Sequence, residues 1–356
     1  MVTIVAFGNF DLEGGRGWAL RTGLERHGYV VEFCRTEKPG LFAKYRDLLR
    51  QWKSRTGHAD LLYVPFLGHY FLPLAWWLAR RERIPLTIDT FLSLYDTEVN
   101  DRKRFSRSHP YAWMLWTFDW LCGQLADAML LDTEEHKEYF VRHYGVSPQK
   151  ILVLPVGCRT DLFVPLHAPP HEGFRVEFHG TFIPLQGIDV ILDAARILQE
   201  RHADDISFEL IGRGQTYQAM HDRANRHALS NVTFTGSLPM DMLPAKIANA
   251  DICLGILGIT EKADRVIPNK AYEVLACGKP LLTGDTTAAR RVLAHGENAY
   301  LSRPGDPEAL AAAILRLKAD PALREKLAKH GRMLTEKQFL PEKIVEPLVQ
   351  WLTARS

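Results

Sequence analysis

The chain has 356 residues, enough for two domains that each bury a core of their own. Hydrophobic residues make up 46% and charged residues 24%, as in globular proteins, and the net charge of +2 gives no electrostatic reason to expect a partner nucleic acid. The five cysteines are scattered without metal-ligand spacing, so we expect reduced thiols and no metal site.

The start of the chain reads as a first strand, because it lacks the basic start and long apolar run of a signal peptide. No segment approaches the roughly 20 apolar residues of a membrane span. We therefore expect a cytoplasmic protein.

In the first half, short apolar runs alternate with amphipathic segments. Strands are predicted at 2–8, 30–35, 61–65, 85–89, 128–132 and 150–155, and helices at 18–27, 70–80 and before residue 128. Strands separated by helices need crossover connections, which predicts a doubly wound parallel sheet.

The same rhythm restarts after residues 158–173, a proline-containing stretch without periodicity that reads as a linker. Strands are predicted at 175–179, 207–211, 232–235, 252–256, 280–283 and 299–302. We expect an α/β protein with two Rossmann-like, doubly wound domains, 1–160 and 161–338, and a terminal helix in 339–356. The active site is then expected in the cleft between the carboxyl ends of the two sheets.

Glycine-containing turns follow several predicted strands. Gly14 and Gly15 precede a helix and would let backbone amides approach a phosphate, with Arg16 adding charge. Gly180 with Thr181, and Arg213, stand in the corresponding turns of the second half. The alternative for any one of them is an ordinary tight turn. No turn fits the dinucleotide or Walker pattern, which disfavours a nicotinamide dehydrogenase or a P-loop enzyme.

The most informative segment is an apolar helix that begins near Asn269. Lys270 and Glu273 are three apart, on one face of its first turns. The lysine and the helix N-terminus suit a diphosphate, and the glutamate suits sugar hydroxyls. Lys262 and Arg265 precede this helix and, with Asn269 at its start, are further donor and phosphate candidates; a solvated loop is the alternative for this charged segment. The segment predicts a nucleotide-diphosphate sugar ligand.

Residues 89–104 follow the fourth strand and are too polar for a core. Asp89 and Asp96 could hold sugar hydroxyls of an acceptor, or simply belong to a surface loop. His69 and His109 could be catalytic or ligand-binding, although a single histidine is more often structural.

Residues 102–120 combine four basic side chains with a run of aromatic ones. This stretch could rest on an anionic membrane surface and admit a lipid-linked acceptor. The alternative is core packing, because aromatics at helical spacing are more often buried.

Taken in order, the motifs of the second half resemble the GT-B glycosyltransferases, specifically the retaining family 4-like enzymes (glycosyl transferases group 1). The resemblance covers both halves and is strongest over 178–331, with matching elements at 179–189, 210–214, 234–237, 250–251, 270–280, 296–301 and 306–310.

The resemblance implies a donor nucleotide-sugar in the C-terminal domain and an acceptor held mainly by the N-terminal one. Glu273 matches the carboxylate that grips the donor ribose, and Gly14, Gly15 and Arg16 match a glycine loop near the donor phosphates. It also implies a last helix that crosses back to the first domain, no bound metal or cofactor, and front-face attack in which the donor phosphate takes the acceptor proton.

Two departures stand out. The family's glutamate eight residues before the ribose glutamate is Arg265 here, and Thr181 and Gln186 stand where the usual phosphate cations would be. We hypothesise that Lys262, Arg265 and Lys270 replace those cations, since a diphosphate still needs neutralising.

The sequence thus predicts a retaining glycosyltransferase that moves a sugar from a UDP- or GDP-sugar to a hydroxyl of a glycan, lipid-linked or small-molecule acceptor. The predicted setting is bacterial surface polysaccharide or glycoconjugate synthesis, in the cytoplasm or at the inner membrane face. The predicted catalytic residues are Glu273, Lys270 and Asp89. Alternatives are another GT-B enzyme, such as a nucleotide-sugar epimerase, and a non-catalytic sugar-binding protein.

Overall fold

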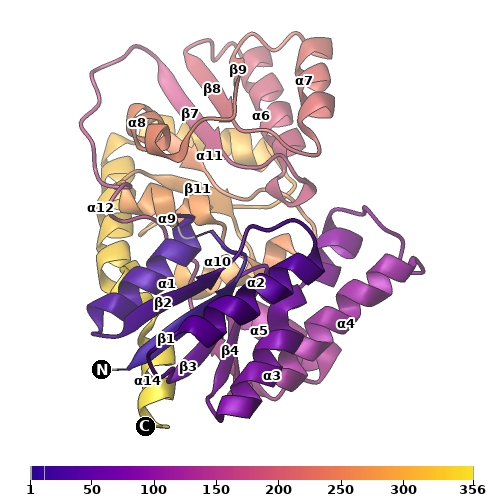
Figure 1. Ribbon diagram of the computed structural model, residues 1–356. Helices are drawn as coiled ribbons and strands as arrows, with labels where there is room; N and C mark the ends of the chain where they lie inside the picture. The colour runs from indigo at the N-terminus through magenta and orange to yellow at the C-terminus, as the bar shows by residue number, and fades with distance from the viewer. Residues whose placement is uncertain (1, 12, 356) are drawn as a thin grey trace. The chain divides into compact units, whose positions relative to one another are not determined.

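A computed structural model describes residues 2–11 and 13–355 of the chain (Figure 1). The chain divides into two compact units, one built from the residues up to Gly157 and from Leu340 onward, the other from Cys158–Phe339. The sequence had placed these boundaries at 160 and 338. Each unit holds one six-stranded sheet whose neighbouring strands pair in parallel. The two predicted α/β halves with parallel sheets are confirmed.

The first unit has the strand order β2-β1-β3-β4-β5-β6. Its strands are β1 (Thr3–Gly8), β2 (Val30–Arg35), β3 (Leu61–Val64), β4 (Leu86–Phe91), β5 (Ala128–Leu131) and β6 (Ile151–Val153). Its helices are α1 (Gly15–Arg26), α2 (Leu41–Ser54), η1 (Gly68–Phe71), α3 (Leu72–Glu82), η2 (Asp96–Asp101), α4 (Pro110–Leu125), α5 (Glu134–Tyr144), η3 (Pro148–Lys150), α13 (Pro341–Ile344) and α14 (Glu346–Thr353).

The side chains of β1 point alternately to two cores, as the period of two in a strand requires. Val5 and Phe7 join the core under α2, α3, α4 and α5, whereas Ile4 and Ala6 join the core under α1 and the C-terminal helices. Both faces of the sheet are therefore covered, which is typical of parallel sheets. The yellow α14 accordingly lies among the indigo elements of this unit in Figure 1.

Gly23, in the middle of α1, shows how closely the chain's end packs on this unit. A Cβ atom at this position would lie 2.2 Å from the carbonyl oxygen of Pro341. Glycine weakens a helix interior, but here only glycine lets α13 approach α1.

The second unit has the order β12-β11-β10-β7-β8-β9. Its strands are β7 (Phe174–His179), β8 (Ile206–Ile211), β9 (Val232–Gly236), β10 (Ile252–Leu254), β11 (Leu281–Gly284) and β12 (Tyr300–Ser302). Its helices are η4 (Pro184–Gln186), α6 (Ile188–Glu200), α7 (Tyr217–Arg226), η5 (Met240–Met242), α8 (Leu243–Asn249), η6 (Ala263–Arg265), α9 (Asn269–Ala276), α10 (Thr287–Val292), α11 (Pro307–Ala319), α12 (Pro321–Leu334) and η7 (Thr335–Phe339).

Two differences from the predicted elements matter for the site. Helix α1 begins at Gly15 rather than near residue 18, so Gly15 and Arg16 belong to its first turn and Gly14 is its N-cap. Residues 41–54, left unassigned by the sequence analysis, form α2, which buries Leu48 and Trp52. Among the described residues, no helix is both long and apolar enough to cross a lipid bilayer.

Candidate functional site

The candidate donor site lies at the carboxyl end of β7, the edge at which parallel α/β sheets bind ligands. Glu177 and His179 are two apart and share one face of this strand, and both are buried. Nδ1 of His179 lies 2.8 Å from a carboxylate oxygen of Glu177, and Nε2 lies 2.8 Å from one of Glu273, on α9. His179, which is itself held by Glu177, thus contacts Glu273, the glutamate that the sequence pattern singled out.

The two neighbouring carboxylates determine the protonation state of His179. Burial by itself lowers the pKa of His179, but the two carboxylates at its ring nitrogens raise that pKa to about 9. The imidazole is therefore a cation at neutral pH and donates from both nitrogens. This fixes the orientation of the Glu273 carboxylate.

The contacts of His179 with Glu177 and Glu273 also predict how the stability of the protein depends on pH. Because the pKa of His179 rises from 6.5 to about 9 on folding, its contribution is complete below pH 6.5 and is lost as the pH rises through 9. We expect His179→Gln to lower the free energy of unfolding at pH 6 by up to about 3 kcal/mol, and the melting temperature with it. At pH 9.5 we expect the substitution to change both quantities far less. Thermal melts of both proteins across this range check it; a gap independent of pH would contradict it.

Lys270 lies one turn before Glu273 on α9 and is also buried. Its ammonium donates to the side-chain oxygen of Gln186 at 2.5 Å and lies 3.5 Å from the ring centroid of Phe178. Burial lowers the pKa of Lys270 well below its usual value, and the carboxylates of Glu177 and Glu273 oppose that shift. A neutral amide and an aromatic face compensate a buried cation only in part, so an anionic ligand would be favoured here.

Gly180 directly follows His179 and makes room for this lysine. Its φ of +147° is uncommon for other residues, and a Cβ atom there would lie 2.9 Å from the Lys270 Nζ atom. Its N–H donates to the carbonyl of Ile211, at the end of β8. The turns after β7 and β8 are thus tied together beside Lys270.

The contacts described above for His179, Glu273 and Lys270 do not include the other residues predicted to bind the donor nucleotide-sugar. Thr181 and Asn269 are exposed, Asn269 in the first position of α9. Arg213 is exposed and rests on the ring of Tyr217. Lys262 is buried directly before η6, and Arg265 ends it, 3.8 Å from Glu261.

In the first unit, the structure joins two residues that the sequence analysis had assigned to different ligands. Arg16 and Asp89 form a buried bidentate pair, with nitrogen–oxygen distances of 2.8 Å. The remaining guanidinium nitrogen donates to the carbonyl oxygen of Leu154 at 2.9 Å. All three nitrogens are thus engaged within the unit, so the geometry favours a structural pair at the carboxyl edge of the sheet. Gly14 and Gly15 lie in the turn that delivers Arg16.

His69 and Asp96 come together in a buried polar cluster with Ser93, Asp119 and Tyr144. Asp119 accepts from Ser93 Oγ at 2.7 Å and from the Tyr144 hydroxyl at 3.1 Å, and the Asp96 N–H donates to Ser93 Oγ. His69 Nε2 lies 3.7 Å from Asp119. Burial lowers the pKa of His69 to about 4 and raises that of Asp119 to about 6, so His69 is neutral at pH 7.

Sequence reasoning missed several of these polar groups. Glu177 and His179 carried a signal, since they alternate with apolar Val176 and Phe178 at the end of a predicted strand. Asp119 carried none, because it lies in an otherwise apolar helix. His109, by contrast, caps α4 by accepting from the N–H of Tyr111.

A second buried pair also escaped the sequence analysis. Asp132 follows β5, and its carboxylate contacts Nδ1 of His136 at 2.5 Å, on α5. The Nε2 atom of His136 is buried without a hydrogen-bond partner among the described residues. Within residues 2–11 and 13–355, no three His, Cys, Asp or Glu side chains are grouped so that they could hold a metal ion.

Comparison with known families matches both units. Residues 173–320 match the family described as Glycosyl transferases group 1, and residues 1–157 match the Glycosyl transferase 4-like domain. An uncharacterized glycosyltransferase of Methanocaldococcus jannaschii is 27% identical over 235 residues, which are 62% of this chain and 64% of that protein. A D-inositol 3-phosphate glycosyltransferase of Thermomonospora curvata is 25% identical over 342 residues, 86% of this chain and 76% of that protein.

Among solved structures, Anabaena HepE in complex with UDP superposes with a TM-score of 0.73 at 18% identity, covering 99% of this chain and 100% of that chain. The likeness confirms the predicted GT-B fold.

Proposed function

Because the chain belongs to the glycosyl transferases group 1 family, we propose that it is a retaining glycosyltransferase that transfers a sugar from a nucleotide-diphosphate sugar to a hydroxyl acceptor. The observation that carries the proposal is the buried group at the end of β7. There His179 orients the Glu273 carboxylate at 2.8 Å, and the buried ammonium of Lys270 lies one helical turn away. In this proposal, a carboxylate that can accept hydrogen bonds from ribose hydroxyls and a cation that can bind phosphate therefore lie one turn apart on α9.

In this proposal, Glu273 accepts hydrogen bonds from the donor ribose and Lys270 binds the diphosphate. The leaving diphosphate gains negative charge as the glycosidic bond breaks, so a fixed cation stabilises the transition state more than the ground state. Asn269, the first residue of α9, adds a side-chain amide at the N-terminal end of the same helix, where the helix dipole also favours an anion. Lys262, Arg265 and Arg213 are proposed as the outer cations.

We assign the acceptor to the first unit and the donor to the second. The cluster of His69, Asp96 and Asp119 and the pair of Asp132 and His136 supply buried polar groups near the carboxyl edge of the first sheet. Arg16 and Asp89 are proposed to hold the loops of that edge in place. Retention follows from the family's front-face mechanism, in which the donor phosphate takes the acceptor proton and no protein nucleophile is needed.

Both UDP- and GDP-sugars are candidate donors. The solved structures of Anabaena HepE contain UDP or UDP-glucose, which supports uridine as the first base to test. We propose a glycan or lipid-linked acceptor in bacterial surface polysaccharide or glycoconjugate synthesis, with the protein in the cytoplasm at the inner membrane face.

Melting temperatures with UDP, GDP and their sugars test donor choice, because a ligand that binds only the folded protein stabilises it by about 2.7 kcal/mol at 100 times its Kd. We expect the correct nucleotide to raise the melting temperature and its sugar to release nucleotide when an acceptor extract is added. Binding without release would favour a non-catalytic protein, and conversion of the nucleotide-sugar to its epimer would favour an epimerase.

Nucleotide binding should also depend on pH through Lys270. Its pKa is lowered in the free protein and should rise when a diphosphate contacts the ammonium, so binding takes up a proton between these two pKa values. We expect affinity for the diphosphate nucleotide to fall as pH rises through this window. Calorimetry in buffers of different ionisation enthalpy measures the uptake. In Lys270→Met, the uptake should disappear and affinity should fall about tenfold or more; unchanged uptake would contradict the assignment.

A further inference from the structure

A pocket lies at the amino ends of β4, β5 and β6, on the edge of the first sheet opposite the strand ends described above. Its volume is about 630 Å³, within the range of roughly 300–1,000 Å³ that is typical of small-molecule sites. Its walls come from the end of α3, from the turns before the three strands and from the residue after α14. None of the described residues that line it belongs to the proposed donor or acceptor groups.

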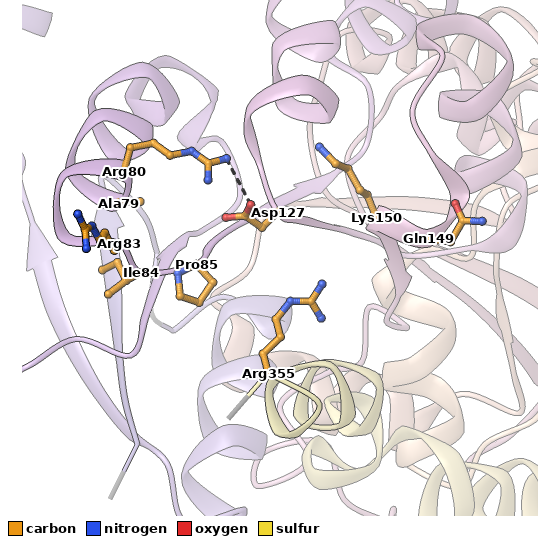
Figure 2. Close-up of a pocket in the computed structure, with 9 residues that line it drawn as sticks. All are labelled: Ala79, Arg80, Arg83, Ile84, Pro85, Asp127, Gln149, Lys150 and Arg355. Carbon is orange, nitrogen blue, oxygen red and sulfur yellow. Dashed lines mark hydrogen bonds and ion pairs between the residues drawn. The ribbon is translucent and has the colours of Figure 1, made fainter.

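The pocket is lined by four cationic side chains and one carboxylate, which are Arg80, Arg83, Lys150, Arg355 and Asp127. In Figure 2, the two arginines from α3 and its following turn lie on one side of Pro85, and Lys150 and Arg355 lie on the other. Segments far apart in the chain thus place their charges around one space. Four cations against one carboxylate leave a formal excess of three positive charges.

The carboxylate of Asp127 is already used within the protein. One of its oxygens accepts from Arg80 at 3.4 Å, and the other accepts from the N–H of Leu86 at 2.9 Å. The Arg80 side chain is 55% exposed, so this long contact holds the guanidinium only weakly. Arg80 therefore remains able to bind a second anion.

Neutral groups position two of the other cations without cancelling their charge. Lys150 donates to the carbonyl oxygens of Gly123 at 3.4 Å and Ala126 at 3.1 Å, at the C-terminal end of α4, where the helix dipole favours a cation. Arg355 lies over the ring of Trp351 and donates to the carbonyl oxygen of the same residue. Both side chains are thus held near the pocket as cations.

Arg83 has the least support from the protein itself. It is the C-cap of α3, its backbone is left-handed with a φ of 58°, and its side chain is exposed. Within residues 2–11 and 13–355, its guanidinium makes no hydrogen bond or ion pair. All of its N–H donors are therefore available to a ligand.

We propose that this pocket binds a small molecule with two or more phosphate groups, and that the bound anion holds α14 against the first unit. Guanidinium groups present paired N–H donors that match phosphate oxygens, and cations on two sides of one space favour several phosphates over one. Ala79, Ile84 and Pro85 form an apolar part of the wall, which suits the carbon skeleton of such a ligand.

The position of Arg355 gives the site a structural consequence. Arg355 follows α14, whose Leu348, Trp351 and Leu352 pack in the core shared with α1. The other end of this C-terminal segment is tied to α1 through the ion pair of Arg26 and Glu342. An anion that bridges Arg355 to the cations of other segments adds an attachment at the far end. Local opening of α14 should then become rarer.

Calorimetry with sodium tripolyphosphate tests the proposal. The titration uses the original protein and Lys270→Met, because a polyphosphate could also bind the proposed donor site. We expect saturable binding in both proteins, weakened by added salt. Arg83→Gln and Arg355→Gln should each weaken it about two- to fivefold. Neither variant should change nucleotide affinity, so failure of the proposed function leaves this test intact.

Arg50→Gln is the matched control, since Arg50 is exposed on α2 of the same unit and does not line the pocket. It should bind tripolyphosphate like the original protein, and melting temperatures confirm that each variant is folded.

Hydrogen exchange tests the predicted attachment of α14. Tripolyphosphate should slow amide exchange over residues 348–353, and Arg355→Gln should remove this protection. The proposal is overturned if tripolyphosphate does not bind, if Arg50→Gln weakens binding as much as Arg83→Gln does, or if exchange in α14 is unchanged at saturation. It is also overturned if Lys270→Met removes all binding while the two pocket variants keep it, because the anion then occupies the donor site.

Discussion

Glu273→Ala is expected to reduce nucleotide-sugar turnover by about 100- to 1,000-fold, the equivalent of two charge-assisted hydrogen bonds to the donor ribose. The Glu273 carboxylate is buried and already oriented by His179, so it can accept hydrogen bonds from the donor ribose without reorganising. The measurement is nucleotide release under saturating acceptor, together with nucleotide affinity by calorimetry.

Glu273→Gln separates the two roles of this side chain. The amide keeps the shape and still accepts one hydrogen bond, but it loses the charge that holds the His179 imidazolium. We expect an intermediate loss of affinity and a lower pKa for His179. Glu325→Ala is the control, since Glu325 is exposed on α12 of the same unit. If Glu273→Ala kept the affinity of the control, the ribose assignment would be wrong.

Arg16→Ala is expected to lower the unfolding free energy by about 3–5 kcal/mol, because it leaves the Asp89 carboxylate buried without its cation. Burial raises the pKa of Asp89, while the guanidinium of Arg16 opposes that shift. Without Arg16 the carboxyl group should therefore take up a proton near neutral pH. The loss of stability should be smaller at acid pH, where that proton is readily supplied.

Arg26→Ala is the matched control on the same helix. Arg26 pairs with Glu342 at 2.6 Å, but both side chains are partly exposed, so this pair should contribute no more than about 1 kcal/mol. Urea unfolding monitored by tryptophan fluorescence compares the two variants. Equal losses would mean that the buried pair has no special role. If Arg16→Ala were fully stable but bound nucleotide poorly, the original assignment of Arg16 to the donor phosphates would regain support.

The strands and helix α9 show which structural elements can be predicted from the sequence alone. Hydrophobic periodicity located the strands that begin each half and the helix that carries Lys270 and Glu273, because burial imposes those periods locally. It missed α2, whose apolar positions are interrupted by many charged residues over 41–54. It also placed the start of α1 three residues late, since the glycines read as a turn.

Partners distant in sequence lay beyond this kind of reasoning. Arg16 and Asp89 are 73 residues apart, and His179 and Glu273 are 94 apart, so only the parallel order of the strands brings each pair together. Nothing in the local pattern around Arg16 distinguishes a phosphate ligand from a buried ion pair.

The amino-acid order by itself determined the α/β class, the two halves, and the helix face shared by Lys270 and Glu273, because periodicity and turn chemistry act over a few residues. Only the tertiary structure decided which charges are neutralised and which remain for a ligand. That distinction depends on burial and on distances between strand ends, which are set by long-range packing. It turned Arg16 from a candidate phosphate ligand into half of a buried pair and revealed His179 beside Glu273.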